Sequence, residues 1–223
     1  MRRAEAQAAL ASIVESAVTL AAGSPDGPTP SLEPAEAALV ATACAERQRE
    51  FAFGRASARA ALRAHGAPVV AIPVGPRREP QWPAGIVGSI THCDGFCAAA
   101  VASSDTVAGL GIDAEVAGAL PDGTAALILD AEERAWLRGR EHALQMVFFS
   151  AKESVYKCLA PLTGLFLDFR DATLTLDLAA ATFVASIRHP ACPIRRLAGR
   201  FALAGGLVLT SVAYRASFDH DDR

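Results

Sequence analysis

The sequence predicts an α+β fold made of two similar α+β halves packed together, with a candidate ligand site at their interface. The chain has 223 residues, enough for one large domain or two small ones that share a core. Hydrophobic residues make up 52% of it and charged residues 20%, which is typical of a folded protein. A helical region followed by strand-like runs occurs twice, so we place the halves at residues 1–110 and 111–223.

The first half contains one helical region between two irregular stretches. Residues 21–36 are rich in proline, glycine and serine and predict an exposed loop. Helical periodicity then extends from about residue 31 to 66, where a glycine suits the end of a helix. A second irregular stretch, residues 74–85, precedes two strand-like runs at 95–103 and 106–113 that are joined by a turn.

The second half repeats this order. A helical region is expected from about Asp130 to Leu159. Three strand-like runs follow, at residues 173–178, 182–187 and 201–214. Ligand sites favour interfaces between such units, so we expect a site where the two halves meet.

Charge and hydropathy exclude two classes of partner. The net charge is −3 and no block of lysine and arginine occurs, so we expect no nucleic-acid partner. No uncharged apolar run approaches 18 residues, so we expect no membrane partner. The first residues resemble a signal peptide, but Glu5, Gln7 and Glu15 interrupt the apolar stretch and favour an amphipathic segment.

The cysteines indicate the compartment. The chain has five of them, an odd number, and no CxxC pair or zinc-site spacing. Reduced thiols of this kind are typical of a cytoplasmic protein, and this is the localisation we predict.

The stretch "GLGIDAEV", Gly109–Val116, carries two carboxylates on one face of an expected strand. Side chains alternate along a strand, so Asp113 and Glu115 point the same way and repel each other. A hard cation between them would turn this repulsion into attraction. Gly111 would let another element approach the backbone closely. The alternative is a solvated strand end.

The stretch "FFSAKESVYKC", residues 148–158, places three charges on an otherwise apolar helix. Glu153 and Lys157 are neighbours on the helix surface and could form an ordinary exposed ion pair. The apolar residues around them leave little helix face for water, however. A third carboxylate, Glu153, would complete a magnesium site with Asp113 and Glu115, and Lys152 and Lys157 would then face phosphates held there.

Basic residues earlier in the chain fit a phosphate-bearing ligand. Arg55, Arg59 and Arg63 recur every four residues along a helix, which is also the pattern of a solvated face. The loop "PRREP", residues 76–80, is bracketed by prolines and would line a flat ligand. His92, at the junction of a loop and a strand, is either structural or part of the site.

Taken together, these motifs resemble those of the 4′-phosphopantetheinyl transferases of the larger, pseudo-dimeric type, especially the subgroup that includes the enterobactin synthase component D proteins. The matching pieces run from about residue 45 to 175: "FAFGRASARAAL", "REPQWPAGIVGSITHCDGFCAAAVA", "GIDAE", "LDAEERAWL", "FFSAKESVYKCLAPLTG" and "LDFRDATL". "GIDAE" is weak alone, but followed at this distance by "FSAKESVYK" it is specific. Phe149 and Ser154 stand where many relatives carry tryptophan and alanine.

The resemblance implies a set of ligand contacts. Asp113, Glu115 and Glu153 would bind Mg²⁺, or Mn²⁺ in its place, whereas Ala114, at the family's middle position, offers no side-chain ligand. The residues implied in binding coenzyme A (CoA), including its phosphates and adenine, are Arg55, Arg63, Arg77, Arg78, Glu79, Pro80, Thr91, His92, Asp113, Lys152, Glu153 and Lys157.

The resemblance also implies a reaction and a partner. The chain would transfer the 4′-phosphopantetheine group of CoA to a serine of an acyl or peptidyl carrier protein, releasing 3′,5′-ADP, with Glu153 and Lys157 as catalytic residues. It would act as a monomer, because the pseudo-twofold interface lies within one chain. Arg134, Arg138 and Arg140 are candidates for docking an acidic carrier. One alternative is an inactive carrier-binding module of the same fold, and a second is another CoA-dependent enzyme such as an acyltransferase.

Overall fold

A computed structural model describes residues 2–215 of the chain. The first part contains α1 (Arg2–Ile13), β1 (Thr19–Gly23), α2 (Pro34–Val40), α3 (Ala45–His65), β2 (Ile86–Cys93) and β3 (Phe96–Ser103). The second contains β4 (Gly109–Val116), α4 (Ala125–Ile128), α5 (Ala131–Leu137), α6 (Ala143–Thr163), the 3-10 helix η1 (Phe169–Asp171), β5 (Ala172–Asp177), β6 (Thr182–Ile187), β7 (Arg196–Ala204) and β8 (Leu207–Tyr214).

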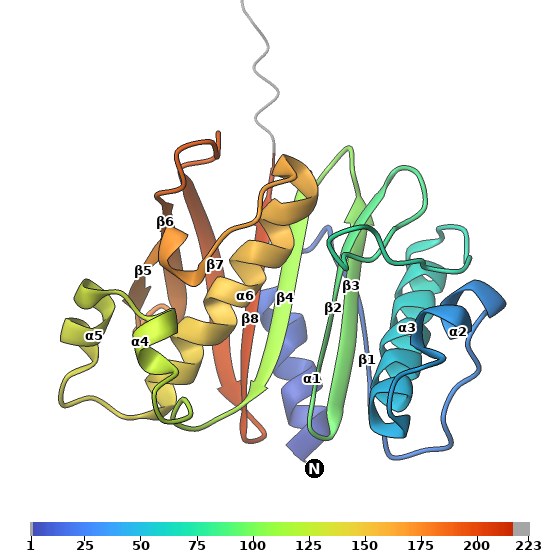
Figure 1. Ribbon diagram of the computed structural model, residues 1–223, viewed down its shortest axis with the longest axis horizontal. Helices are drawn as coiled ribbons and strands as arrows, with labels where there is room; N and C mark the ends of the chain where they lie inside the picture. Colours follow the sequence, from blue (N-terminus) through green and yellow to red (C-terminus); the bar gives the residue numbers. More distant parts are fainter. Residues whose placement is uncertain (1, 216–223) are drawn as a thin grey trace, which may run out of the picture.

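Two antiparallel sheets form the centre of the molecule (Figure 1). One has the strand order β1-β3-β2 and the other β4-β8-β7-β6-β5. Each half contains a strand, a helix of 21 residues and a two-stranded hairpin, namely β1, α3 and β2–β3, then β4, α6 and β7–β8. The hairpin strand that returns pairs with the first strand in both halves, β3 with β1 and β8 with β4. The predicted α+β fold with two similar halves is thus confirmed.

The helices divide the core into separate layers. In β8, Val208 and Val212 belong to the cluster that α6 covers, whereas Leu207 and Leu209 belong to the cluster that α1 covers. Since neighbouring strand residues face opposite ways, α1 and α6 lie on opposite faces of the second sheet. The N-terminal helix therefore packs on the sheet of the other half. The boundary at residue 110 stays a prediction, and β4 spans it.

Several local predictions were incomplete. The helical region 31–66 is two helices, α2 and α3, and the region after residue 130 is also two, α5 and α6. Gly139 lies within the break between α5 and α6, and its φ of 73° is incompatible with a helix. β1 and β2 were not predicted, and the two runs joined by the turn at residue 104 belong to different sheets. Within residues 2–215, no helix is long and apolar enough to span a membrane.

Candidate active site between the two halves

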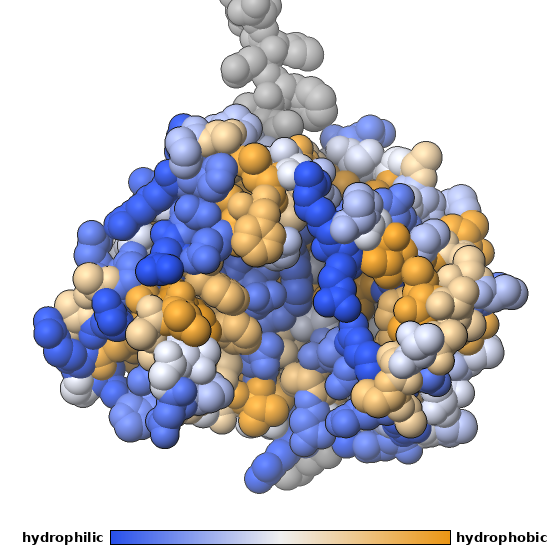
Figure 2. Space-filling model, viewed as in Figure 1, coloured by the Kyte–Doolittle hydropathy of each residue, from blue (hydrophilic) through white to orange (hydrophobic). Residues whose placement is uncertain are grey.

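The two sheets meet where β2 and β4 run side by side. Hydroxyl groups of β2 bind the backbone of β4: Ser89 Oγ accepts from Ile112 N at 3.0 Å, and Thr91 Oγ1 accepts from Ala114 N at 3.0 Å. The residue numbers of both strands increase together from the first pair to the second, so the strands are parallel here. Side-chain hydroxyls thus replace a backbone ladder at this seam, and Figure 2 shows hydrophilic side chains running down this face between the halves.

Close packing brings α6 onto β4. A Cβ atom at Gly111 would lie 1.9 Å from the carbonyl oxygen of Ser154, so only glycine permits this approach. Beside this contact, Thr210 of β8 binds the hydroxyls of Ser150 and Ser154 at 3.0 and 2.6 Å. The expectation that another element approaches Gly111 is confirmed, and the element is α6. Ser154 serves helix packing through this contact.

Three carboxylates lie close enough at this contact to affect one another. Asp113 is buried, and its Oδ1 accepts hydrogen bonds from Lys157 Nζ at 2.6 Å and Thr91 Oγ1 at 3.2 Å. Burial, followed by the charge of Asp113, raises the pKa of Glu115 to about 7, with Lys157 opposing and Glu153 adding to the shift. Burial also raises the pKa of Glu153, against the attraction of Lys157. The fold thus concentrates negative charge here.

Carboxylate oxygens are the ligands that a hard divalent cation prefers. Asp113 Oδ2 is buried and has no hydrogen-bond partner among the described residues, so one carboxylate oxygen faces inward unsatisfied. The mutual repulsion of the carboxylates is the interaction that a hard cation would reverse. Within residues 2–215, no three metal-ligating side chains already lie close enough to hold an ion, and the ammonium of Lys157 is the cation beside Asp113. The metal ligands therefore stay a prediction.

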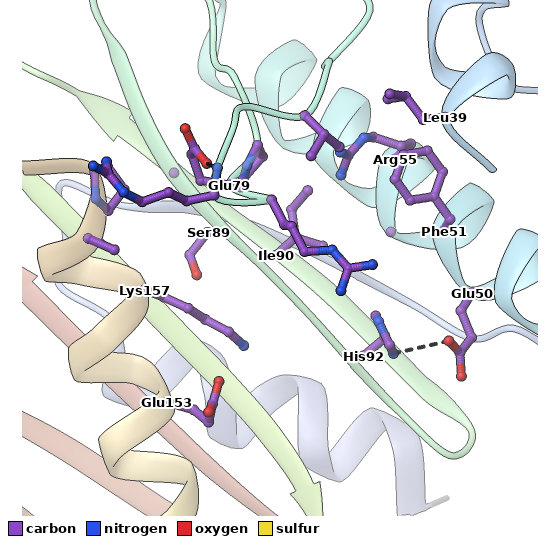
Figure 3. Close-up of a pocket in the computed structure, with 18 of the residues that line it drawn as sticks. Leu39, Glu50, Phe51, Arg55, Glu79, Ser89, Ile90, His92, Glu153 and Lys157 are labelled. Atoms are coloured by element: carbon purple, nitrogen blue, oxygen red, sulfur yellow. Dashed lines mark hydrogen bonds and ion pairs between the residues drawn. The ribbon is translucent and has the colours of Figure 1, made fainter. Parts of the chain in front are cut away.

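A cavity of about 600 Å³ opens beside these carboxylates. Its walls come from α3, the loop before β2, β2 itself and α6, so both halves contribute (Figure 3). Eight residues that the sequence indicated line it: Arg55, Arg77, Arg78, Glu79, Pro80, His92, Glu153 and Lys157. Figure 3 shows Glu153 and Lys157 projecting from α6 towards the side of the cavity formed by β2.

Arg55 offers an unused donor in the cavity wall. Its guanidinium lies 4.3 Å from the centre of the Phe51 ring, and the residue is only 5% exposed. The Nε atom has no partner in the part of the chain that the structure describes. Burial lowers the pKa of Arg55 to about 10, with Glu36 opposing. An anion is the partner that such a buried, unsatisfied guanidinium favours.

The loop before β2 is a folded turn. Gly75 N donates to Glu79 O at 2.8 Å, and Arg77 N donates to the Glu79 carboxylate at 2.8 Å. Arg78 has a φ of 69°, an unusual value for a residue with a side chain. The proline-bracketed loop is thus held by its own hydrogen bonds, with strain at one of its two arginines.

His92 lies at the rim of the cavity beside two charged side chains, those of Arg47 and Glu50. Arg47 can only donate, so its 3.1 Å contact makes His92 Nε2 the acceptor. His92 Nδ1 lies 4.0 Å from Glu50, the contact dashed in Figure 3. Burial lowers the pKa of His92, and the charge of Glu50 opposes this effect. The arrangement favours a neutral imidazole.

Other predicted residues lie outside the cavity. Arg63 is exposed near the end of α3, and Arg59 pairs with buried Glu36 at 2.6 Å. Thr91 does not line the cavity, but its hydroxyl donates to Asp113 Oδ1 at 3.2 Å. The prediction that Lys152 faces phosphates is wrong for this structure, because its ammonium is buried against Glu133 at 2.7 Å.

The sequence reasoning missed Arg47, Glu50, Ser89, Tyr156 and Phe166, all of which line the cavity. A signal for Arg47 was present. The four-residue spacing of the arginine stripe continues backwards through Phe51 to Arg47, and this part of α3 faces the cavity. Extending the stripe forwards to residue 63 followed the wrong end of the helix.

Comparisons with known proteins identify the family of this chain. Residues 35–102 match the family "4′-phosphopantetheinyl transferase N-terminal domain", and residues 109–204 match the "4′-phosphopantetheinyl transferase superfamily". The chain is 47% identical to the 4′-phosphopantetheinyl transferase Svp of Streptomyces mobaraensis, over 86% of this chain and 82% of the relative. It is 39% identical to Npt of Nocardia iowensis, over 81% and 88%. Enterobactin synthase component D of Salmonella typhi is 39% identical over 52% of this chain and 49% of the relative. The chain belongs to the 4′-phosphopantetheinyl transferase superfamily.

Proposed function

We propose that this enzyme transfers the 4′-phosphopantetheine group of CoA to a carrier-protein serine at the cavity between its halves. One observation carries the location. The unsatisfied carboxylate oxygen of Asp113 lies beside Lys157, and Lys157 and Glu153 line a cavity of about 600 Å³ that also holds Arg55, Arg77 and Arg78. Acidic side chains that repel one another, next to several arginines, suit a metal-bound polyanion better than any neutral ligand.

Asp113, Glu115 and Glu153 are the proposed ligands of Mg²⁺, with Mn²⁺ as a substitute. When bound there, the metal neutralises charge on the pyrophosphate of CoA. Ala114 contributes no side-chain ligand, which leaves the remaining ligands to water and phosphate oxygens.

The arginines and His92 bind the other end of CoA in this proposal. Arg55 has a free buried donor, and Arg77 and Arg78 lie on the folded loop across the cavity. They would contact the 3′-phosphate and the adenosine, with Glu79 and Pro80 beside the adenine. His92 supplies a neutral imidazole at the rim.

Glu153 and Lys157 carry the chemistry. The serine Oγ forms a bond to the β-phosphorus of CoA, and the bond from that phosphorus to the bridging oxygen breaks. Glu153 accepts the serine proton, a role that its position in the cavity lining beside Lys157 supports. Lys157 stabilises the departing 3′,5′-ADP. Positioning and electrostatics provide most of the rate in transfers of this kind.

Mass spectrometry of carrier proteins tests the proposal. Purified enzyme, CoA and Mg²⁺ are incubated with carriers from fatty-acid, polyketide, nonribosomal-peptide and siderophore synthesis. We expect at least one carrier to gain phosphopantetheine, with release of an equal amount of 3′,5′-ADP. A carrier that binds the enzyme but gains no mass would instead support an inactive binding module.

The proposal includes a monomer that acts in the cytoplasm. All five cysteines have free thiols, which a reducing compartment maintains. Both walls of the cavity come from one chain, so catalysis needs no second copy. Light scattering at working concentration checks the monomer, and a stable dimer would refute it.

A further inference from the structure

Lys152 stands directly before Glu153 in α6, yet its ammonium group lies in the core. The residue is 2% exposed, and Nζ donates to Ile128 O at 2.8 Å, Glu133 Oε2 at 2.7 Å and Phe169 O at 2.9 Å. An ammonium has three protons, and three acceptors therefore use all of them. Lys152 has no donor left for a phosphate of CoA.

Glu133, the acidic member of the pair, is also held by hydrogen bonds from backbone N–H groups. Its carboxylate also accepts from Asp130 N at 2.9 Å and Leu174 N at 2.8 Å. Asp130 in turn accepts from Thr173 Oγ1 at 2.6 Å. The pair therefore joins α6 to the start of α5 and to β5 in one hydrogen-bond network.

The burial of this pair needs a reason besides stability. Burial lowers the pKa of Lys152 and raises the pKa of Glu133, and in each case the charge of the other residue opposes the shift. Buried ion pairs add little stability compared with packed apolar residues, because desolvation offsets their attraction. Fixing one geometry is the best-attested use of such pairs.

The pair fixes the part of α6 that carries Glu153. Consecutive helix residues point about 100° apart, so the direction of Lys152 sets the direction of Glu153. Ser150 and Ser154 hold the helix down onto β8 through Thr210. Lys152 fixes one side of α6 by donating to the carbonyl groups of Ile128 and Phe169 and to the carboxylate of Glu133. Without the contacts of Lys152, α6 would be free to rotate about the contact of Ser150 and Ser154 with Thr210.

We propose that Lys152 is a positioning residue whose buried pair with Glu133 fixes the rotation of α6 that places Glu153 at the cavity beside Lys157. This inference rests on the proposed function, since it concerns the carboxylate assigned there as metal ligand and base. It gives Lys152 a role in place of the phosphate contact that the sequence indicated.

Steady-state kinetics of four variants test the inference well below their melting temperatures. Lys152→Met and Glu133→Gln each remove the charge pair, and Lys152→Met/Glu133→Gln removes both charges. Glu132→Gln is the matched control, because Glu132 is the neighbouring residue on α5 and its side chain is 76% exposed. For each variant, kcat, the KM for CoA and the half-saturating Mg²⁺ concentration are measured.

We expect Lys152→Met and Glu133→Gln to raise the half-saturating Mg²⁺ concentration and lower kcat by about 10- to 100-fold, the usual effect of losing a group that orients a ligand. The KM for CoA should stay within about twofold of wild type, because the residues that bind adenosine are untouched. Glu132→Gln should match wild type. The double variant should regain thermal stability, since no buried charge is unpaired, but keep the Mg²⁺ defect, since methionine donates no hydrogen bond.

Three results would overturn the inference. A higher KM for CoA in Lys152→Met, with Glu133→Gln unchanged, would make the lysine a phosphate ligand. Recovery of kcat and of the Mg²⁺ response together with stability in the double variant would make the pair purely structural. Should Lys152→Met fail to fold, Glu133→Gln carries the test, and a wild-type Mg²⁺ response in that variant refutes the role. Absence of transfer by wild-type enzyme on every carrier is a different outcome: it refutes the proposed function and removes the basis of this inference.

Discussion

Replacing Glu115 by glutamine should stabilise the metal-free protein at alkaline pH. Burial and the charge of Asp113 raise the pKa of Glu115 from 4.5 to about 7. Between these values the folded protein holds a proton that the unfolded chain has released, so the free energy of unfolding falls as pH rises. The penalty is absent well below pH ~4.5, where both states are protonated, and complete above pH ~7. Glutamine carries no charge, so the substitution removes this penalty.

The size of the effect follows from the two pKa values. A change from 4.5 to about 7 corresponds to at most ~3.4 kcal/mol at pH ~8.5 and to ~0.8 kcal/mol at pH ~5. Glu115 is partly exposed, and water and salt reduce the effect. We therefore expect Glu115→Gln to gain about 1 to 2 kcal/mol more stability at the higher pH than at the lower one.

Urea unfolding measures this difference directly. Wild type and Glu115→Gln are unfolded in EDTA at both pH values, and then at the higher pH with Mg²⁺ and CoA in place of EDTA. Ligands that bind only the folded state should stabilise wild type more than the variant, which reverses their order. A stability difference between the two proteins that is the same at both pH values would refute the proposed charge repulsion at Glu115.

Three further substitutions test other parts of the site. Glu153→Gln should reduce the transfer rate by about 10²-fold or more while the protein stays folded, and near-normal 3′,5′-ADP release would contradict its role as base. Arg55→Met should raise the KM for CoA by about 10- to 100-fold, because a buried charged donor is lost. The control Arg63→Met, on the same helix, should change this KM less than about twofold. Equal effects of the two substitutions on the KM would exclude a special role for Arg55. Gly111→Ala should lower the free energy of unfolding in urea by about 1–3 kcal/mol and lower the activity, since the new Cβ collides with α6. The control Gly118→Ala should match wild type, because nothing lies within 4 Å of a Cβ atom there. Similar stability of both variants would argue against the tight packing.

Residue positions that depend on local pattern were predicted well. Strand alternation placed Asp113 and Glu115 on one face, and this is the face where Gly111 meets α6. The spacing of Glu153 and Lys157 indicated charges retained on a mostly apolar helix, and both line the cavity. In each case the reasoning needed only the geometry of a single element.

Features that depend on distant parts of the chain were missed. β1 has five residues, and its pairing with β3 crosses almost eighty residues of sequence, so no local signal identifies it. Lys152 and Glu153 differ by one step along α6, and the sequence does not tell which of them meets the cavity. Glu133, on α5, decides this by pairing with Lys152. A buried partner of this kind is visible only once the elements are packed.

Manganese binding tests the central claim, that Asp113, Glu115 and Glu153 share one divalent cation beside the CoA cavity. Electron paramagnetic resonance measures free Mn²⁺ during titration of the protein with CoA present, and a titration of CoA alone corrects for metal bound by the nucleotide. We predict one site in the wild-type protein, weakened about tenfold or more in each of Asp113→Asn, Glu115→Gln and Glu153→Gln. Equal Mn²⁺ affinity in wild type and all three variants would contradict the shared site.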